Sequence, residues 1–482
     1  MARPGAQHGL AQRRLEIETV AAAGWRDACA AALEGGERFA GAFAGGTGSA
    51  PAWSAIFAQG GAVRVIRTTV AEPVASIVDL APAADWDERE AHDRYGLQFA
   101  GHEPLRPLLD HDPDLASWTV PVEGVGTHQV AVGPVHAGVI ESGHFRFHVV
   151  GERILVLDPR LFYKHRGLEV AAEGLPLADG LAYAQRACGA CAVSNAVAYA
   201  QASEMLKGAA AMPAVSRART VLLELERLYN HLNDIAAICA GVGFATGNMA
   251  FAALKERALR LSQAVGGHRF LFGTVHVARS EIELAGPELQ GARDCLRDLH
   301  VDAAASWREL EFAAPFQARL DGIGLLTRDA ADRLGAVGPA ARAAGSREDV
   351  RAHSPGLLYG SSFAAARLDR PDGDVAARLR IRAAELEQTF ELLDELLAAP
   401  LERASAGVSG TEQELAVARV ESPRGETVCV VEGSAGRLQR LHLRTGSYAN
   451  WPALAHATAG ELLPDFPLIN KSFELCYACV DR

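Results

Sequence analysis

Two Cys-x-x-Cys pairs far apart in the sequence constrain this chain more than any other feature. The first pair holds Cys188 and Cys191, the second holds Cys476 and Cys479, and more than half of the sequence lies between them. Two such pairs can supply four sulfurs to a single metal site. A fold that uses them together must bring distant parts of the sequence side by side and join the pairs through the core of one domain.

Two familiar uses of Cys-x-x-Cys pairs are structural zinc binding and redox disulfides. Zinc sites usually take their ligands from one compact module, which the long interval disfavours but leaves open. Redox disulfides of this type normally follow the first strand of a βαβ unit, whereas Cys188 and Cys191 are predicted to lie at the start of a helix. A helix N-terminus favours the thiolate form that binds metal. The other cysteines stand alone and are interpreted as small buried hydrophobic residues: Cys29, Cys239, Cys295 and Cys429.

The composition describes an acidic protein with enough apolar residues for a large core. Hydrophobic residues make up 49% of the 482 residues, a length that indicates two or more domains. The net charge of −12 excludes nucleic acid as the main partner. No apolar run approaches the roughly 20 residues that span a bilayer, and Glu16 and Glu18 interrupt what would be a signal core. We therefore expect the chain to fold in the cytoplasm and to meet the cytoplasmic face of a membrane only through partner subunits.

The first 118 residues are predicted to form a small α+β domain. An amphipathic segment covers residues 14–33, and the Gly/Ala-rich stretch 41–50 is predicted to be a loop. Two β-type runs follow, and the charged segment Asp85–Tyr95 is predicted to be helical. The Pro- and Asp-rich stretch Pro104–Pro121 is interpreted as a linker. The two β-type runs are Ala62–Val70 and Val74–Leu80.

The remaining residues, 119–482, are predicted to form a mainly helical domain with small β-sheets. Alternating apolar residues predict strands within Thr127–Asp158 and again near Glu414–His442, followed by a short helix near Trp451–Ala459 and an extended tail. The Gly-rich stretch 241–247 follows a helix and lacks the G-x-G-x-x-G spacing, which excludes a dinucleotide loop. Apolar residues at three- and four-residue spacing predict helices at about 175–208, 214–240, 248–266, 283–313 and 374–398.

Several motifs resemble those of one enzyme family. The frame Arg186-Ala-Cys-Gly-Ala-Cys191, combined with the second Cys-x-x-Cys pair, resembles the signature of NiFe-hydrogenase large subunits. Further segments in family order resemble the energy-converting, membrane-associated group, particularly its formate hydrogenlyase type. These are Gly133-Pro-Val-His, Glu141-Ser-Gly-His-Phe-Arg, Arg160-Leu-Phe-Tyr-Lys-His-Arg-Gly-Leu-Glu169, Glu224-Leu-Glu-Arg-Leu-Tyr-Asn-His231, Ser422-Pro-Arg-Gly425 and Tyr448-Ala-Asn-Trp-Pro452.

The N-terminal part resembles a different protein of the respiratory chain. Asp85-Trp-Asp-Glu-Arg-Glu-Ala-His-Asp-Arg-Tyr-Gly96, followed by Gly101-His-Glu-Pro-Leu-Arg106, resembles the thirty-kilodalton subunit of complex I. Residues 119–482 are likewise similar to the forty-nine-kilodalton subunit of complex I. The resemblance implies an α+β fold in which a small domain like the thirty-kilodalton subunit, residues 1–118, precedes a mainly helical hydrogenase large-subunit domain, residues 119–482.

The resemblance also implies a metal centre. Cys188, Cys191, Cys476 and Cys479 match the nickel ligands of the family, and by their order Cys191 and Cys479 would also bridge to iron. In the family the iron carries CO and cyanide ligands delivered by maturation proteins. Soft thiolates suit nickel and low-spin iron, and an open position on nickel is where hydrogen would bind and split.

Three further residues match family positions with a role. Glu141 matches the glutamate that passes protons away from the metals, and Arg424 matches the arginine that overhangs them. Glu169 matches a position associated in some relatives with a second, structural metal such as magnesium. Without the motifs, these residues would be interpreted as a surface carboxylate, a turn arginine and a solvated helix residue. His144 and His231 lie in matched motifs, where core or hydrogen-bonding roles compete with catalytic ones.

Three positions depart from the family pattern. Asn195 stands where the family usually has histidine, and Glu474-Leu475 replaces the usual Asp-Pro. These changes spare every metal ligand but alter the surrounding shell that orients ligands. Arg482 stands where a C-terminal extension of related precursors is cut, so we expect either a mature form or a protein that needs no such cut.

The resemblance implies the catalytic subunit of a membrane-associated hydrogenase complex, an oxidoreductase that interconverts H2 with protons and electrons. The electrons would pass to an iron–sulfur small subunit, because this chain has no spare cysteine cluster, and complex I-like membrane subunits would complete the assembly. Asn195 and Glu474-Leu475 motivate an alternative, a non-hydrogenase subunit of a complex I-like assembly that couples quinone or ion reactions. A structural zinc site is a third hypothesis.

Overall fold

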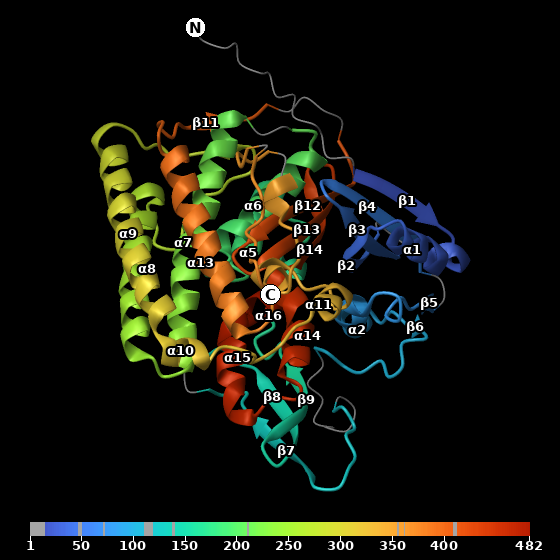
Figure 1. The fold of residues 1–482 in the computed structure, drawn as a ribbon. Coiled ribbons are helices and arrows are strands. Elements are labelled where there is room, and N and C mark those ends of the chain that lie inside the picture. Colours follow the sequence, from blue (N-terminus) through green and yellow to red (C-terminus); the bar gives the residue numbers. More distant parts are fainter. Residues whose placement is uncertain are drawn as a thin grey trace.

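Two units of different size make up the part of the chain that the structure describes (Figure 1). The smaller holds residues 15–109 and the larger begins after residue 118, so the predicted boundary between 118 and 119 lies at the edge of undescribed residues and stays a prediction. The computed structural model describes residues 15–46, 51–70, 73–109, 119–136, 140–209, 212–353, 356–360, 362–407 and 412–482.

The smaller unit is a four-stranded sheet with two helices. The sheet order is β1-β4-β3-β2, in which β1 pairs parallel to β4 and the other neighbours are antiparallel. The predicted helix Asp85–Tyr95 is confirmed as α2. The elements are β1 (Leu15–Val20), α1 (Trp25–Glu34), β2 (Arg38–Gly45), β3 (Ala52–Gln59), β4 (Ala62–Thr69), β5 (Val74–Ala75), α2 (Asp85–Tyr95) and β6 (Phe99–Ala100).

Three predictions for this unit differ in part from the structure. The amphipathic segment 14–33 is divided between strand β1 and helix α1, and the β-type run Val74–Leu80 keeps only two strand residues in β5. Residues 41–45 of the predicted loop belong to β2, while 47–50 lie outside the described residues. The glycines of β2 make room for the larger unit, because a Cβ at Gly41 would lie 2.6 Å from Arg444 Cδ.

The larger unit begins with an antiparallel sheet and continues into helices. The predicted β-type alternation in 127–158 is confirmed by β7, β8 and β9, and the helix predicted at 175–208 is two helices, α5 and α6. The elements are β7 (Thr127–Val132), β8 (His144–Val150), β9 (Arg153–Arg160), α4 (Leu168–Ala172), α5 (Leu177–Gln185), α6 (Ala192–Leu206), α7 (Pro213–Gly241), α8 (Ala245–Gly266), β10 (Arg279–Ser280), α9 (Gly286–Phe312), α10 (Ala314–Ala318), α11 (Arg328–Arg333), α12 (Gly338–Ala343), α13 (Val375–Leu396) and β11 (Ala404–Ser405).

Four long helices run side by side at one end of the molecule: α7, α8, α9 and α13 (Figure 1). α7 starts with Pro213 at its first position, where the missing N–H costs nothing, and it is buried at nearly every position between Val215 and Ala236. The C-terminal part of the larger unit adds a three-stranded antiparallel sheet, and α6 packs on two of its strands, β12 and β13. The remaining elements are β12 (Leu415–Ser422), β13 (Gly425–Ser434), β14 (Arg437–Arg444), α14 (Gly446–Thr458), α15 (Phe466–Phe473) and α16 (Tyr477–Asp481).

The extended tail predicted after residue 459 was wrong, because α15 and α16 occupy it. Short apolar helices of this kind give little periodicity in the sequence, and contacts to the rest of the domain hold them. Arg482 follows α16 and is buried in the middle of the molecule, between the two units (Figure 1). Across the described ranges, no helix combines the length and the apolar character needed to cross a membrane.

An apolar interface joins the two units. One face of the N-terminal sheet packs against β12 and β13, so that Phe43 and Ile56 share a buried cluster with Val417 and Val430. Ion pairs flank this cluster, among them Arg67 with the buried Glu432. The smaller unit is therefore fixed against the sheet whose last strand leads directly into α14.

Candidate metal centre

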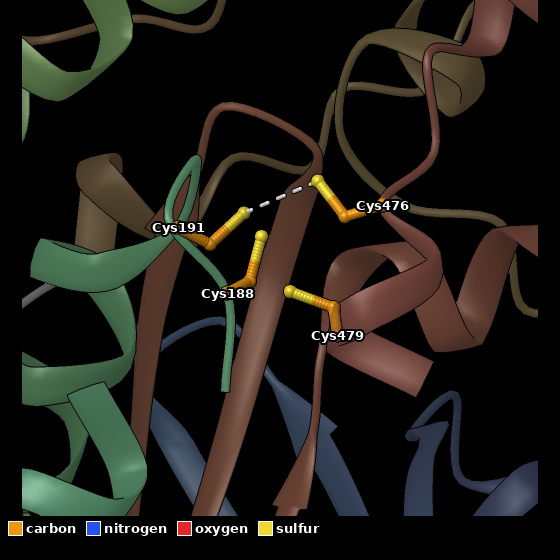
Figure 2. A group of neighbouring side chains, drawn as sticks. All are labelled: Cys188, Cys191, Cys476 and Cys479. Carbon is orange, nitrogen blue, oxygen red and sulfur yellow. Dashed lines mark hydrogen bonds between the residues drawn. The ribbon is translucent and has the colours of Figure 1, made fainter. Parts of the chain in front are cut away.

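The four cysteines predicted to bind metal meet at one place. Their sulfur atoms all lie within 4.8 Å of one another, and the Sγ atoms of Cys191 and Cys476 are 4.0 Å apart. Figure 2 shows the four side chains turned toward a shared space, one pair from each end of the domain. All four are buried, and Cys479 has no exposed surface. The prediction that both pairs serve one site agrees with this geometry.

Helix α6 positions the first pair. Cys191 is the N-cap residue of α6, which agrees with the predicted helix start. The carboxylate of Glu226 accepts hydrogen bonds from the Val193 N–H at 2.6 Å and from the Ser194 N–H at 3.1 Å, and so satisfies free donors of the first turn. The Ala190 N–H donates to Cys188 Sγ at 3.3 Å. The turn that carries both cysteines is therefore held at a capped helix end.

Helix α16 and the strand–helix connection before α14 position the second pair. The Cys476 N–H donates to Ser447 Oγ at 2.9 Å, and the Thr445 hydroxyl donates to the Cys479 carbonyl at 3.4 Å. Glu474 ends α15 in the left-handed region at φ 49°, which turns the chain toward the cysteines. Buried contacts with Thr445 and Ser447, at the start of α14, therefore fix the conformation of the short segment that carries Cys476 and Cys479.

One stripe of α7 connects the two pairs. Glu226, Asn230 and Asp234 follow each other at four-residue spacing and face the site on one side of the helix. Asn230 Nδ2 donates to the Ala190 carbonyl at 2.8 Å, and Asn230 Oδ1 accepts from Arg424 Nη2 at 3.2 Å. A single rigid helix therefore sets the distance from the first cysteine pair to Arg424.

Arg424 lies beside the cysteines and is held by Asp234. Its Nη1 donates to Asp234 Oδ2 at 2.6 Å, while Nε has no acceptor within the described residues although it is buried. Burial opposes the charge, but Asp234 and the sulfurs of Cys476 and Cys191 hold the pKa of Arg424 well above its usual value. A fixed positive charge faces the sulfur cluster.

The backbone around Arg424 is packed too closely for any side chain. A Cβ at Gly338 would lie 2.4 Å from Gly425 Cα, and one at Gly446 would lie 2.8 Å from the carbonyl carbon of Arg424. Gly338 and Gly425 also have positive φ values of 66° and 117°, which L-residues rarely adopt. The turn that presents Arg424 is therefore fixed by backbone contact with α12 and α14.

The sulfur atoms influence one another's ionisation. Hydrogen bonds from Cys188, Cys191 and Cys479, together with the charge of Arg424, hold the pKa of Cys476 well below its usual range. The pKa of Cys191 and of Cys479 is raised, because ionisation would lose hydrogen bonds that their thiols donate within the group, and because burial and repulsion by a neighbouring thiolate disfavour a further negative charge. A multivalent cation removes this repulsion, so the donor set suits a soft metal or metal pair.

Glu141 reaches the same site from the surface. Its Oε2 accepts a hydrogen bond of 2.9 Å from the Ala478 N–H, and Ala478 lies between Cys476 and Cys479. The side chain is exposed just before β8. The structure therefore places this predicted residue next to the second cysteine pair, with solvent on its other side.

Glu169 lies elsewhere, at the junction of the two units. It is buried on α4, where its Oε1 accepts from Arg482 Nε at 2.7 Å and its Oε2 pairs with Arg94. Arg482 and Arg94 outweigh the cost of burial and hold the pKa of Glu169 below its usual range. Its carboxylate lies within 4.8 Å of possible ligand atoms of Glu90 and His442. Arg482 and Arg94 therefore occupy contacts of the carboxylate that the resemblance predicts to bind magnesium.

The departures from the family pattern lie near the site, where Asn195 and Leu475 are buried and Glu474 is half-buried. Asn195 is in the first helical turns of α6 with no exposed surface, and neither amide atom has a partner among the described residues. Glu474 accepts from Asn233 Nδ2 at 3.2 Å, and burial together with the neighbouring Asp234 raises its pKa to about 7. The replacement of an aspartate by Glu474 therefore keeps a carboxyl group but places it in an environment that favours the neutral form.

The two histidines from matched motifs have hydrogen-bonding positions. His144 Nδ1 lies 3.2 Å from the Gly133 carbonyl, and His231 Nε2 lies 2.9 Å from Glu385 Oε2. Sequence reasoning gave no role to Glu226, Asn230 and Asp234, although the first two lie in a matched motif and all three follow each other at four-residue spacing on α7.

Comparisons with known proteins agree with the two-unit fold. The chain matches the respiratory-chain NADH dehydrogenase 49 Kd subunit family over residues 241–405 and 395–482, and the 30 Kd subunit family over residues 55–120. A solved relative is the membrane-bound sulfane sulfur reductase, an archaeal respiratory membrane complex. A chain of that complex shares 25% identity with a TM-score of 0.67, covering 74% of this chain and 99% of the other.

Curated relatives include several hydrogenase subunits. Formate hydrogenlyase subunit 5 of Escherichia coli (strain K12) is 30% identical, with 84% of this chain and 76% of the relative covered. The membrane-bound hydrogenase subunit alpha of Pyrococcus furiosus is 25% identical, with 73% and 87% covered. An NADH-quinone oxidoreductase component of Phocaeicola vulgatus is 26% identical, with 77% of each chain covered. The chain therefore belongs to the family that contains both hydrogenase large subunits and the 49 Kd subunit of complex I. It is a member of the formate hydrogenlyase type, in which a domain related to the 30 Kd subunit is fused at the N-terminal side.

Proposed function

We propose that this chain is the catalytic subunit of a membrane-associated hydrogenase complex, which interconverts H2 with two protons and two electrons. The observation that carries the proposal is the buried group of four cysteine sulfurs within 4.8 Å, faced by the fixed charge of Arg424. Formate hydrogenlyase subunit 5 and hydrogenase-4 component G of Escherichia coli (strain K12), each 30% identical, support it.

A nickel–iron pair with CO and cyanide on iron is the group that these residues suit. Cys188, Cys191, Cys476 and Cys479 would hold it. Thiolates are soft ligands, and four of them with one guanidinium nearby give a negatively charged donor set that divalent metal ions largely offset. When bound, the metals supply heterolytic cleavage of H2 and accept the two electrons.

Arg424 places a positive charge next to the cysteine sulfurs, and Asp234 holds it there. The guanidinium of Arg424 helps to stabilise thiolate over thiol at Cys476, because opposite charges attract strongly in a buried site. Asp234 keeps that guanidinium in one orientation through the bond of 2.6 Å. The pair therefore fixes both the position and the charge of the group next to the reacting atoms.

Glu141 would move protons between the sulfurs and solvent. Its Oε2 is tied to the Ala478 N–H, which leaves Oε1 as the atom to take a proton from the second cysteine pair and release it at the surface. Because the side chain is exposed, solvent can accept the proton directly.

Partner subunits would complete the reaction. Relatives that belong to membrane-bound complexes support peripheral attachment at the cytoplasmic face of a membrane through complex I-like membrane subunits. Electrons would leave through an iron–sulfur small subunit, since the four cysteines outside the centre do not gather into a second sulfur cluster in the described structure. Magnesium at Glu169 is a minor, structural component of the proposal, and it would have to displace Arg94 or Arg482 from that carboxylate.

Metal analysis of protein matured in its native host tests the proposal. We expect nickel and iron at one each per chain, with infrared bands from CO and cyanide. Cys479→Ser should lose nickel and hydrogen turnover, whereas the matched control Cys295→Ser, at a half-buried cysteine of α9, should keep both. Absence of nickel together with absence of the infrared bands would refute the proposal, and stoichiometric zinc would indicate a structural site instead.

A second candidate is a non-hydrogenase subunit of a complex I-like assembly, with roles in quinone or ion coupling. The observation that favours it is the altered shell at Asn195 and Glu474, where a buried amide has no partner among the described residues and a carboxyl group has its pKa raised to about 7. Under this candidate, Cys479→Ser would leave assembly and activity of the complex intact.

A further inference from the structure

A closed ring of charges joins the N-terminal domain to the last turn of the chain. Glu90 and Arg94 come from α2, Glu169 from α4, and Arg482 from the residue after α16. Arg482 Nη2 lies 2.6 and 2.7 Å from the two carboxylate oxygens of Glu90, and its Nε lies 2.7 Å from Glu169 Oε1. Arg94 closes the ring, with Nη1 at 2.9 Å from Glu90 Oε1 and a direct pair with Glu169.

The charges of this ring balance. Two carboxylates and two guanidiniums alternate, and every side chain in it is less than a tenth exposed. His442 also lies near Glu169, at 3.7 Å, but burial together with Arg482 and Arg94 lowers its pKa to about 4, so it adds no charge at neutral pH. Removing one member leaves an unpaired charge in a buried place, which is far more costly than losing the whole pair.

The ring connects directly to the metal centre through α16. Helix α16 has five residues, Tyr477–Asp481, and Cys479 is its third. A helix of that length does not persist without tertiary contacts. Arg482, three residues after Cys479, donates its backbone N–H to the Ala478 carbonyl at 3.2 Å, so its side chain anchors the far end of the same turn.

Helix α2 is also held by contacts outside the charge ring, with β14 and α14. Asp87 pairs with Arg444 of β14 at 3.1 Å, and Trp86 packs edge-on against Tyr448 of α14 with ring centroids 5.5 Å apart. The guanidinium of Arg482 lies over the same Tyr448 ring, 4.9 Å from its centroid. α2 therefore presents Glu90 and Arg94 from a rigid position rather than from a loose surface helix.

We propose that Glu90 and Arg94 of the fused N-terminal domain are positioning residues of the metal centre, which hold Arg482 and through α16 keep Cys479 at the sulfur cluster. The fused domain thus takes part in building the cysteine site although none of its described residues is a ligand there. This inference rests on the shared cysteine site and holds for whichever metal that site binds.

Matched carboxylate-to-amide variants test the inference in the full-length chain. Glu90→Gln removes one charge of the ring, and Glu432→Gln removes one charge from Arg67–Glu432, an ion pair at the same domain interface without contact to α16. In protein produced without nickel, we expect Glu90→Gln to raise iodoacetamide labelling of the cluster cysteines about tenfold relative to the lone buried Cys239, because the local opening of α16 becomes easier. Glu432→Gln should leave that ratio unchanged.

Hydrogen exchange shows whether the opening is confined to α16, and the milder variant Glu90→Asp tests the inference if Glu90→Gln fails to fold. The α16 amides should lose protection in Glu90→Gln while those of α6 keep it, and Glu90→Asp, which retains the charge, should give an intermediate increase in labelling. Equal labelling ratios in Glu90→Gln and Glu432→Gln would overturn the inference. Nickel content of natively matured Glu90→Gln, expected to be reduced, depends also on the proposed function, whereas labelling and exchange do not.

Discussion

Replacement of Asp234 by asparagine separates the charge of this residue from its shape. Asp234 is fully buried and accepts from Arg424 Nη1 at 2.6 Å and from Arg382 Nε at 3.1 Å. Asp234→Asn keeps the size of the side chain but removes the negative charge that pairs with the guanidiniums of Arg424 and Arg382. The position of Arg424 beside the cysteine sulfurs should then be lost or loosened.

Two quantities set the stability that Asp234→Asn is expected to lose. Burial raises the pKa of Asp234, but Arg424, His231 and Arg382 outweigh it and lower the value from 3.8 to about 2. At 1.36 kcal/mol per unit this corresponds to about 2 kcal/mol of stability at neutral pH. Breaking a buried pair by removing one partner costs about 3 to 5 kcal/mol. We therefore expect a loss of about 3 kcal/mol and a fall in melting temperature of several degrees.

The assay compares stability, metal content and turnover in the same preparations. Asp349→Asn is the matched control, because Asp349 is buried as well and pairs with Arg351 at 2.8 Å, away from the sulfur cluster. Both variants should melt at lower temperature and keep nickel. Hydrogen evolution should fall about a hundredfold only in Asp234→Asn, since a displacement of about 1 Å has effects of that size. Turnover at the wild-type rate in nickel-loaded Asp234→Asn would refute the role given to the Asp234–Arg424 pair.

Three further perturbations give separate expectations. Glu141→Gln should keep nickel and the infrared bands but lower hydrogen turnover about a hundredfold or more, with a larger solvent isotope effect, because an amide at this position cannot carry a proton; an unchanged rate would contradict the proton route. The pKa of Glu90 in the fold is about 2 against an ordinary 4.5, so its contribution of about 3 kcal/mol is complete above pH 4.5 and lost as the pH falls toward 2, and melting curves of Glu90→Gln should depend less on pH in this window. Gly338→Ala, whose Cβ would lie 2.4 Å from Gly425 Cα, should lower the melting temperature and hydrogen turnover together, whereas Gly291→Ala, which has open space in α9, should leave both unchanged or slightly raise stability.

Local patterns in the sequence predicted most of the elements. Helices α7, α8, α9 and α13 and strands β7 to β9 were predictable because long periodic segments carry their own signal. Strand β2 was not, since Gly41 and Gly45 give the appearance of a loop; their small size matters only because Arg444 and Glu432 lie against them. Helices α15 and α16 were missed because contacts with α14, outside either helix, decide their conformation.

In the candidate site too, residues within local motifs were predictable from the sequence, and contacts between distant residues were not. The four cysteines were predictable because Cys-x-x-Cys is a local pattern, and Glu141 and Arg424 because short motifs surround them. The partners of Glu169 were not predictable, because Arg94 and Arg482 lie far from it in sequence and meet it only after both domains have folded. Buried charge pairs of this kind leave no periodic or compositional trace.

The distance between the two cysteine pairs has a consequence during synthesis. More than half of the sequence must be translated between Cys188 and Cys476, and at roughly 5 to 20 residues per second this takes about 15 to 60 seconds. Throughout that interval the nascent chain offers only two of its four sulfurs, with neither α16 nor Arg482 available to enclose them. Complete coordination therefore becomes possible only when translation has passed Cys479, so a filled site marks a chain in which both cysteine pairs have been made and brought together by folding.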